Sequence, residues 1–255
     1  VKVGFMHGDG QSKVNETQHI VDAAARHQLT VNFHDNPIPP TGDRRSYPHR
    51  LTREFCHSQQ DRRWSFSPSE FLKTVFVNMV AGPLDMDNGV YALNTVKDRQ
   101  KGPNNDMFST VAAETARTLI VFSGLTVLPD SPEEYQKKAD IFEFIKEMPS
   151  TWDETKILHG KYGQHITTAR RSGQQWFVGS VINEVGGSLD IALNFLTDGI
   201  EYDITLYQDA KETHYKTNKE AYRVSKISGN KNDTIKAVMA PGGGHAMWIR
   251  PSIQK

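Results

Sequence analysis

The first 34 residues change from a strand-like to a helix-like pattern and back, and this alternation restricts the fold more than any other feature of the sequence. Val1, Val3 and Phe5 share one face of a period-two segment, and residues 29–34 form a second such segment. Between them, residues 11–27 carry apolar side chains and alanines at helical spacing. A strand, a helix and a strand in so short a stretch predict a βαβ unit and therefore a parallel sheet.

The second of these strands ends in two polar residues, His34 and Asp35. A loop rich in Pro and Arg follows, and it leads to a further carboxylate at Glu54. Barrel enzymes present catalytic groups in this way, because residues at the C-terminal end of a strand are free of core packing. A plain strand followed by a surface loop would show the same pattern, so both interpretations stand at this point.

The character of the chain changes near residue 148, where helical patterns give way to short period-two segments. Turns rich in Gly, Asn and Asp separate these segments, which lie at residues 165–169, 176–181, 189–193, 202–206 and 234–238. This arrangement predicts a small antiparallel β-sandwich. We therefore expect two domains, an α/β domain at residues 1–147 and a β-sandwich domain at residues 148–255.

Composition excludes several classes of function. Lys and Arg together number 30, as do Asp and Glu, so the net charge gives no electrostatic case for binding nucleic acid or a membrane surface. Cys56 is the single cysteine, which excludes an internal disulfide and a multi-cysteine zinc site. No apolar run approaches the roughly 18 residues of a membrane span.

Three further motifs have a structural interpretation beside a functional one. Ser67 and Pro68 suit the cap and first position of a helix. Asp85 and Asp87 follow an apolar run and are expected either at a pocket rim or as turn-capping residues. The glycines at residues 242–244 follow a strand with no helix after them, so they do not predict a phosphate-binding loop.

An ordered set of segments runs through nearly the whole chain: VKVGFMHGDGQ, VNFHDNPIPPTGDRRSYPHRLTRE, MVAGPLDMDNG, LTVLPDSPEEY, TWDET, ITTARRSGQQWFVGSV and MAPGGGHAMWIRP. This set resembles glycoside hydrolase family 97. The resemblance implies an α/β fold in which residues 1–147 are the second half of a TIM-type (β/α)8 barrel, beginning near its fourth strand. It also implies that residues 148–255 are the C-terminal antiparallel β-sandwich of that family.

The resemblance implies an activity as well. Family members hydrolyse α-glycosidic bonds, so the expected function is cleavage of terminal α-linked glucose or galactose from oligosaccharides, as an α-glucosidase-like hydrolase. The family depends on Ca²⁺, which becomes the expected cofactor, and a periplasmic or secreted location is expected from the same resemblance.

The strand that resembles the fourth strand of the barrel bears on the stereochemistry. Retaining members of the family carry an Asp nucleophile at its end, whereas this chain has Gly4 and His7 at the matching places. Neither can form a glycosyl ester, so we expect an inverting mechanism. By the same resemblance, Asp35 is the water-activating base and a calcium ligand, and Glu54 is a second calcium ligand.

The general acid is the largest departure from the family pattern. The position that resembles it holds Gln60, which cannot donate a proton as a carboxylic acid does. Asp61 or Glu54 is the expected substitute. Lys2 and His34 resemble sugar-binding residues, with a salt-bridged lysine and a hydrogen-bonded core histidine as their structural interpretations.

Two other hypotheses remain beside the hydrolase. The missing nucleophile and acid are also what a degenerate carbohydrate-binding protein would show. Alternatively, the chain is an inactive piece of a larger glycosidase, because a strand that starts at Val1 predicts a missing N-terminal portion. The open edges of a half-barrel then favour a homo-oligomer.

Overall fold

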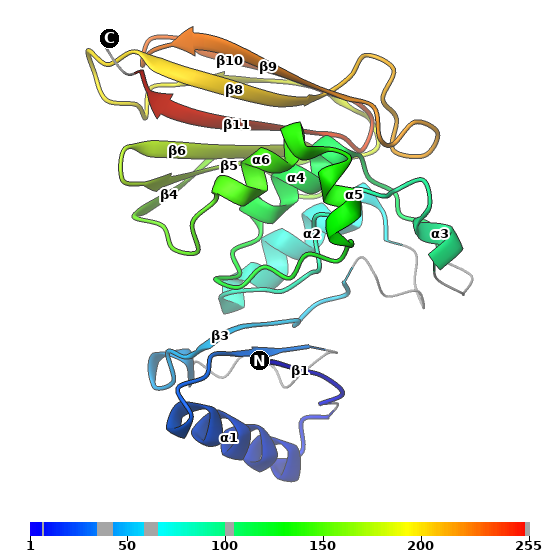
Figure 1. The fold of residues 1–255 in the computed structure, drawn as a ribbon, viewed down its shortest axis with the longest axis vertical. Coiled ribbons are helices and arrows are strands. Elements are labelled where there is room, and N and C mark those ends of the chain that lie inside the picture. The colour runs from blue at the N-terminus through cyan, green and yellow to red at the C-terminus, as the bar shows by residue number, and fades with distance from the viewer. Residues whose placement is uncertain (7, 35–42, 59–65, 100–104, 253–255) are drawn as a thin grey trace.

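The computed structural model describes residues 1–6, 8–34, 43–58, 66–99 and 105–252 of the chain. Figure 1 shows an elongated molecule in which a small α/β layer lies at one end, helices occupy the middle and antiparallel strands form the other end. The chain passes through these three layers in order, and the larger antiparallel sheet packs on the helices of the middle layer.

The N-terminal layer is the parallel unit that the sequence predicts. It contains β1 (Lys2–Val3), α1 (Gln11–Arg26), β2 (Val31–Phe33) and β3 (Arg50–Arg53). The strands lie in the order β1, β2, β3 and all pair in parallel. Helix α1 covers the sheet because Val21 and Ala24 recur on one of its faces and pack against Val31 and Phe33.

Two extended segments continue this layer beyond β3. The Asp85 N–H donates to the Arg53 carbonyl at 2.8 Å, and the Leu84 N–H donates to the Phe122 carbonyl at 2.8 Å. The segment around Leu84 therefore lies between β3 and the segment around Phe122. Neighbouring segments that bond side by side in this way bring their C-terminal ends to one edge of the layer.

The middle layer consists of helical segments that connect and cover the extended ones. They are η1 (Asp43–Arg45), α2 (Pro68–Asn78), η2 (Met79–Ala81), α3 (Val96–Arg99), α4 (Val111–Ile120), α5 (Pro132–Gln136) and α6 (Ala139–Glu147). The expected start of α2 is confirmed, since the Ser67 hydroxyl accepts a hydrogen bond from the Glu70 N–H at 3.2 Å. Thr110 caps α4 in the same way through the Ala113 N–H.

The C-terminal layer is antiparallel throughout its described part. Its strands are β4 (Glu154–Lys161), β5 (His165–Ser172), β6 (Gln175–Ile182), β7 (Gly187–Ala192), β8 (Tyr202–Asp209), β9 (Tyr222–Gly229), β10 (Thr234–Met239) and β11 (Gly244–Pro251). One sheet has the order β4, β5, β6, β11, β8, β9, and β10 pairs with β7 in a second sheet. Apolar side chains between the two sheets form a core that includes Trp176, Ile191 and Met247.

The other face of the larger sheet shares its core with the helices. Phe177, Trp248 and Ala246 from the strands belong to the same buried cluster as Leu119 and Phe144 from α4 and α6. The last helix of the α/β part ends at Glu147 and the first β-strand begins at Glu154, so the change of architecture occurs between these residues. The packing is nevertheless continuous across that change.

Glycines allow the backbone of α4 to lie directly on the sheet. A side chain at Gly179 in β6 would reach within 2.9 Å of the Ala116 carbonyl oxygen, and one at Gly244 in β11 would overlap the Ala113 backbone. The glycines at the start of β11 therefore have a packing role.

A buried carboxylate also joins the start of α4 to the larger sheet. Asp209 in β8 accepts hydrogen bonds from the Thr110 hydroxyl at 2.7 Å, the Ala240 N–H at 3.0 Å and the Gly244 N–H at 2.9 Å. Burial raises the pKa of Asp209 to about 6, against the opposing effect of these three donors.

The stability of the protein is expected to fall between pH 4 and 6 through Asp209. Its carboxyl group binds a proton more tightly in the folded chain than in the unfolded chain, so raising the pH through this window removes stability. Ionisation of Asp209 removes on the order of 3 kcal/mol from the free energy of unfolding across this window. Thermal unfolding of the wild-type protein and Asp209→Asn from pH 4 to 7 measures it. The difference in unfolding midpoint between the wild-type protein and Asp209→Asn should narrow as the pH rises. A difference that stays constant would contradict the prediction.

Helix α4 also contains a buried ion pair. Glu114 and Arg117 have side chains that are 0% and 2% exposed, and Glu114 Oε1 lies 2.8 Å from Arg117 Nη1. The other carboxylate oxygen of Glu114 accepts the N–H groups of Gly89 and Val90. Glu114 thus connects α4 to the segment that follows Asp87.

Candidate active site

Two of the predicted site residues meet at the C-terminal ends of neighbouring parallel strands. His34 follows β2 and Glu54 follows β3, and the Glu54 N–H donates to the Phe33 carbonyl at 2.8 Å. This register brings the two side chains together, with His34 Nδ1 at 3.0 Å from Glu54 Oε2. Glu54 is buried, while the imidazole of His34 is 20% exposed.

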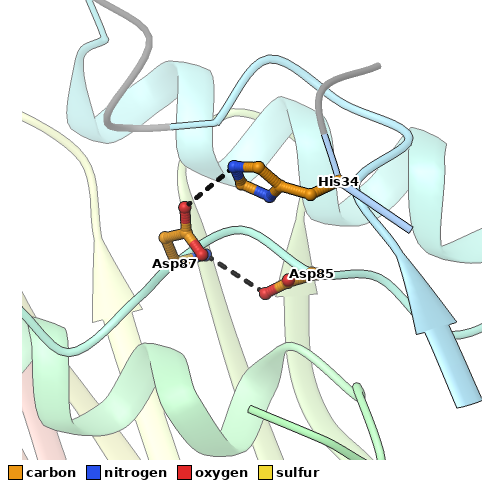
Figure 2. Close-up of side chains that lie close together, drawn as sticks. All are labelled: His34, Asp85 and Asp87. Carbon is orange, nitrogen blue, oxygen red and sulfur yellow. Dashed lines mark hydrogen bonds and ion pairs between the residues drawn. The ribbon is translucent and has the colours of Figure 1, made fainter. Parts of the chain in front are cut away.

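The segment after Leu84 adds two aspartates to this edge. The Asp87 carboxylate points to the His34 ring, with Oδ2 at 3.7 Å from Nε2, and Asp85 lies beneath it (Figure 2). Both aspartates are buried. Asp87 has a φ of +50°, in the left-handed region that residues with a side chain seldom adopt.

Lys2 reaches the same cluster from β1. Its ammonium nitrogen lies 3.2 Å from Asp87 Oδ1 and 3.8 Å from Asp85 Oδ2. Asn32, which is opposite Lys2 in the parallel register, donates from Nδ2 to Asp85 Oδ2 at 2.6 Å. The contacts therefore link β1, β2 and the segment after Leu84 across the edge of the sheet.

The electrostatics of the cluster are set by burial. Desolvation raises the pKa of Asp85, and the nearby Asp87 carboxylate adds to this rise, while Asn32 and Lys2 oppose it. Lys2, His34, Glu54, Asp85 and Asp87 carry more acidic than basic groups. Such a site can accept hydrogen bonds from the hydroxyl groups of a polar ligand and can supply carboxylates for proton transfer.

The structure places the predicted residues in two groups. Lys2, His34 and Glu54 lie together, whereas Asp35 and Asp61 are outside the described residues, as is the departure at Gln60. Asp85 and Asp87 were predicted to be rim or turn residues, and they contact the other members directly. Their signal in the sequence is a pair of carboxylates after an apolar run, the same pattern as at His34.

The described residues differ in how well they fit a metal ion. His34, Asp85 and Asp87 offer ligand atoms that lie within 4.8 Å of one another. The ammonium of Lys2 already contacts both aspartates, so a metal ion at this group would compete with a positive charge. Glu54 adds a buried carboxylate at the same edge, and carboxylate oxygens are the hard ligands that Ca²⁺ takes.

Comparison with known proteins identifies this architecture. Residues 1–56 match the family model described as Glycoside hydrolase 97, and residues 151–250 match the model described as Glycosyl-hydrolase 97 C-terminal, oligomerisation. The chain belongs to glycoside hydrolase family 97. The resemblance of the sequence segments to this family is thereby confirmed.

Individual relatives agree over nearly the whole chain. A Bacteroides thetaiotaomicron protein named retaining alpha-galactosidase is 29% identical over 98% of this chain. A family 97 enzyme from a Pseudoalteromonas species, solved in complex with acarbose, is 31% identical over 96% of this chain with a TM-score of 0.87. A solved β-arabinopyranosidase, 22% identical with a TM-score of 0.76, shares the fold. The chain spans 38% of the length of each of the first two.

These matches confirm the predicted fold class. The family 97 chain has part of a (β/α)8 barrel followed by a C-terminal antiparallel β-sandwich. The candidate site lies where such barrels carry their active sites, at the C-terminal ends of the strands. Within the described part of the chain, no helix has the length and apolar character needed to cross a bilayer.

Proposed function

We propose that this family 97 protein hydrolyses terminal α-linked galactose or glucose from oligosaccharides. The observation that carries the proposal is the convergence of Lys2, His34, Glu54 and Asp87 at the C-terminal ends of barrel strands. Carboxylates at this edge suit glycoside hydrolysis, which requires a pair of them. The Bacteroides relative named as an alpha-galactosidase supports the choice of sugar.

We assign the roles to residues as follows. Asp35 acts as the base that activates water, and Glu54 or Asp61 donates the proton to the leaving oxygen. Lys2 and His34 bind sugar hydroxyl groups. The end of β1 is followed by Gly4, which offers no nucleophile, and this supports inversion of the anomeric centre.

The experiment is hydrolysis of p-nitrophenyl α-galactoside and α-glucoside, with NMR detection of the anomer released first. The β-anomer is expected. Release of the α-anomer would overturn the role of Asp35 and would agree with the relative that is named retaining. Turnover of neither substrate would overturn the hydrolase proposal.

We also propose that Glu54 and Asp35 hold a calcium ion. A bound calcium ion would supply positive charge beside the sugar hydroxyl groups. Calcium is expected to raise the thermal unfolding midpoint of the protein after EDTA treatment and dialysis, because a ligand of the folded state stabilises it. At a concentration 100 times the Kd the gain is about 2.7 kcal/mol.

Glu54→Gln separates this calcium effect from a general effect of salt. The variant should lose most of the calcium-dependent rise in the unfolding midpoint, with Mg²⁺ as the control ion. A rise of equal size in the wild-type protein and the variant would contradict the assignment of Glu54.

A carbohydrate-binding protein without catalysis is the second candidate. The observation in its favour is that Gly4 and Gln60 stand where family members carry a nucleophile or an acid. Isothermal titration with galactose and glucose distinguishes the two candidates. Binding without turnover supports the second candidate, and turnover excludes it.

We further propose that the protein forms a homo-oligomer through its β-sandwich. The support is the description of the family model that matches residues 151–250, which includes oligomerisation. Size-exclusion chromatography with light scattering should give a mass at least twice that of the 28.7 kDa chain. A monomer at micromolar concentration would contradict this proposal.

A further inference from the structure

Asp87 is the residue at which Lys2 and His34 meet. Its Oδ1 lies 3.2 Å from the Lys2 ammonium nitrogen. Its Oδ2 lies 3.7 Å from His34 Nε2 (Figure 2). We propose that Asp87 is a positioning residue that fixes Lys2 and His34 for recognition of sugar hydroxyl groups. This inference rests on the proposed function, because it concerns how the same site recognises its sugar.

The backbone around Asp87 is held in one unusual conformation. Asp87 adopts a left-handed φ of +50°, and its N–H donates to Asp85 Oδ1 at 3.5 Å. Asn32 fixes Asp85 in turn, through the 2.6 Å hydrogen bond to Oδ2. A non-glycine residue in this region is strained, and such strain is found where the surroundings require one geometry. The position of the Asp87 carboxylate is therefore determined by β2 and by Asp85.

The segment after Asp87 is fixed independently. The buried Glu114 of α4 accepts hydrogen bonds from the Gly89 N–H at 2.9 Å and the Val90 N–H at 3.2 Å. Asp87 thus lies between two anchors, Asp85 on one side and the Glu114 contacts on the other. A carboxylate held in this way can impose its geometry on a more flexible partner.

Lys2 is that flexible partner. Its side chain is 34% exposed, while that of Asp87 is 10% exposed, so the lysine is partly open to solvent and the aspartate is almost enclosed. A lysine side chain has a flexible four-carbon stem and loses rotamer entropy when its ammonium is fixed. The Asp87 contact removes part of that freedom before a ligand arrives, which strengthens binding through preorganisation.

Carboxylate oxygens face both nitrogens of the His34 ring. Glu54 Oε2 lies 3.0 Å from Nδ1, and Asp87 Oδ2 lies 3.7 Å from Nε2. Loss of the Asp87 carboxylate would release the Nε2 side of the ring and the Lys2 ammonium together. One residue therefore controls the geometry of two proposed sugar contacts that come from different strands.

The test compares Asp87→Asn with Asp130→Asn in the complete protein. Asp130 is a matched control, because it holds the same segment at a different point, where it accepts the N–H groups of Tyr91 at 2.5 Å and Ala92 at 2.9 Å. Titration calorimetry with galactose and glucose is expected to show at least a tenfold weaker affinity for Asp87→Asn. The affinity of Asp130→Asn should stay within twofold of the wild-type value, even if its unfolding midpoint falls.

A double variant tests whether Asp87 acts through Lys2. If it does, Lys2→Met combined with Asp87→Asn loses less affinity than the product of the two single effects. Strictly multiplicative effects would overturn the positioning role. Wild-type affinity in Asp87→Asn would also overturn it.

The NMR signal of the Lys2 ammonium gives a readout that needs no sugar. Its protons should exchange with water more slowly in the wild-type protein than in Asp87→Asn, because a charge-assisted hydrogen bond protects them. Equal exchange would overturn the positioning role alone. Slow exchange in a wild-type protein that binds neither sugar would instead overturn the proposed function, and with it the role of this contact in sugar recognition.

Discussion

Glu54→Gln is expected to lower kcat/KM for p-nitrophenyl α-galactoside by about 10²–10⁴-fold, if the proposed hydrolase function holds. The substitution keeps the size of a side chain that lies 3.0 Å from His34 but removes the group that could exchange a proton. Positioned acid–base groups contribute a factor of this size to catalysis. Steady-state kinetics at saturating calcium measures the effect, so that a weakened metal site does not add to it.

The control for Glu54 is a carboxylate of the same type with a structural contact. Glu184 accepts hydrogen bonds from the N–H and hydroxyl of Ser69 at the start of α2. Glu184→Gln should leave kcat/KM within about threefold while changing stability slightly. Equal losses in the two variants would show that Glu54 has no special role in the chemistry.

Glu114→Gln is expected to destabilise the folded protein by about 3–5 kcal/mol. The substitution removes the negative charge that lies 2.8 Å from the buried guanidinium of Arg117, and removal of one member of a buried pair carries this cost. The guanidinium carbon also lies 4.4 Å from the ring centroid of Phe71, so Arg117 cannot turn to solvent without opening the core. Chemical denaturation with a two-state fit gives the free energy of unfolding.

The matched control is the same substitution in an exposed pair of the same spacing. Glu16 and Lys13 in α1 are three residues apart, like Glu114 and Arg117, but their side chains are 49% and 40% exposed. Glu16→Gln should change the free energy of unfolding by less than about 1 kcal/mol, because exposed pairs contribute little. Destabilisation of similar size in both variants would contradict the buried-pair explanation.

Local patterns predicted much of the fold. The period of the apolar residues indicated the βαβ start and the late antiparallel strands, because periodicity reflects which face of an element is buried. Ser67 and Pro68 predicted the start of α2, since capping depends on neighbours in sequence. At the site, the period-two pattern located the strand end at His34, and Glu54 was found as the carboxylate that follows the next loop.

Contacts between distant residues could not be predicted in this way. Lys2 and Asp87 are 85 residues apart, and their pairing depends on the order in which extended segments lie side by side. The packing role of Gly244 depends on α4, which lies more than a hundred residues earlier in the chain. Neither relation leaves a periodic or local signal, because each arises from tertiary packing.

The close packing of α4 on the sheet has a consequence for the design of chimeras between members of this family. A chimera that joins two relatives after residue 147 would place a helix from one parent on strands from the other. Gly179 in β6 and Gly244 in β11 leave no room for a side chain against the α4 backbone, so α4 and these strands should be inherited together. Crossovers that keep α4 with its own strands should therefore give more folded hybrids than crossovers at the visible change from helix to strand.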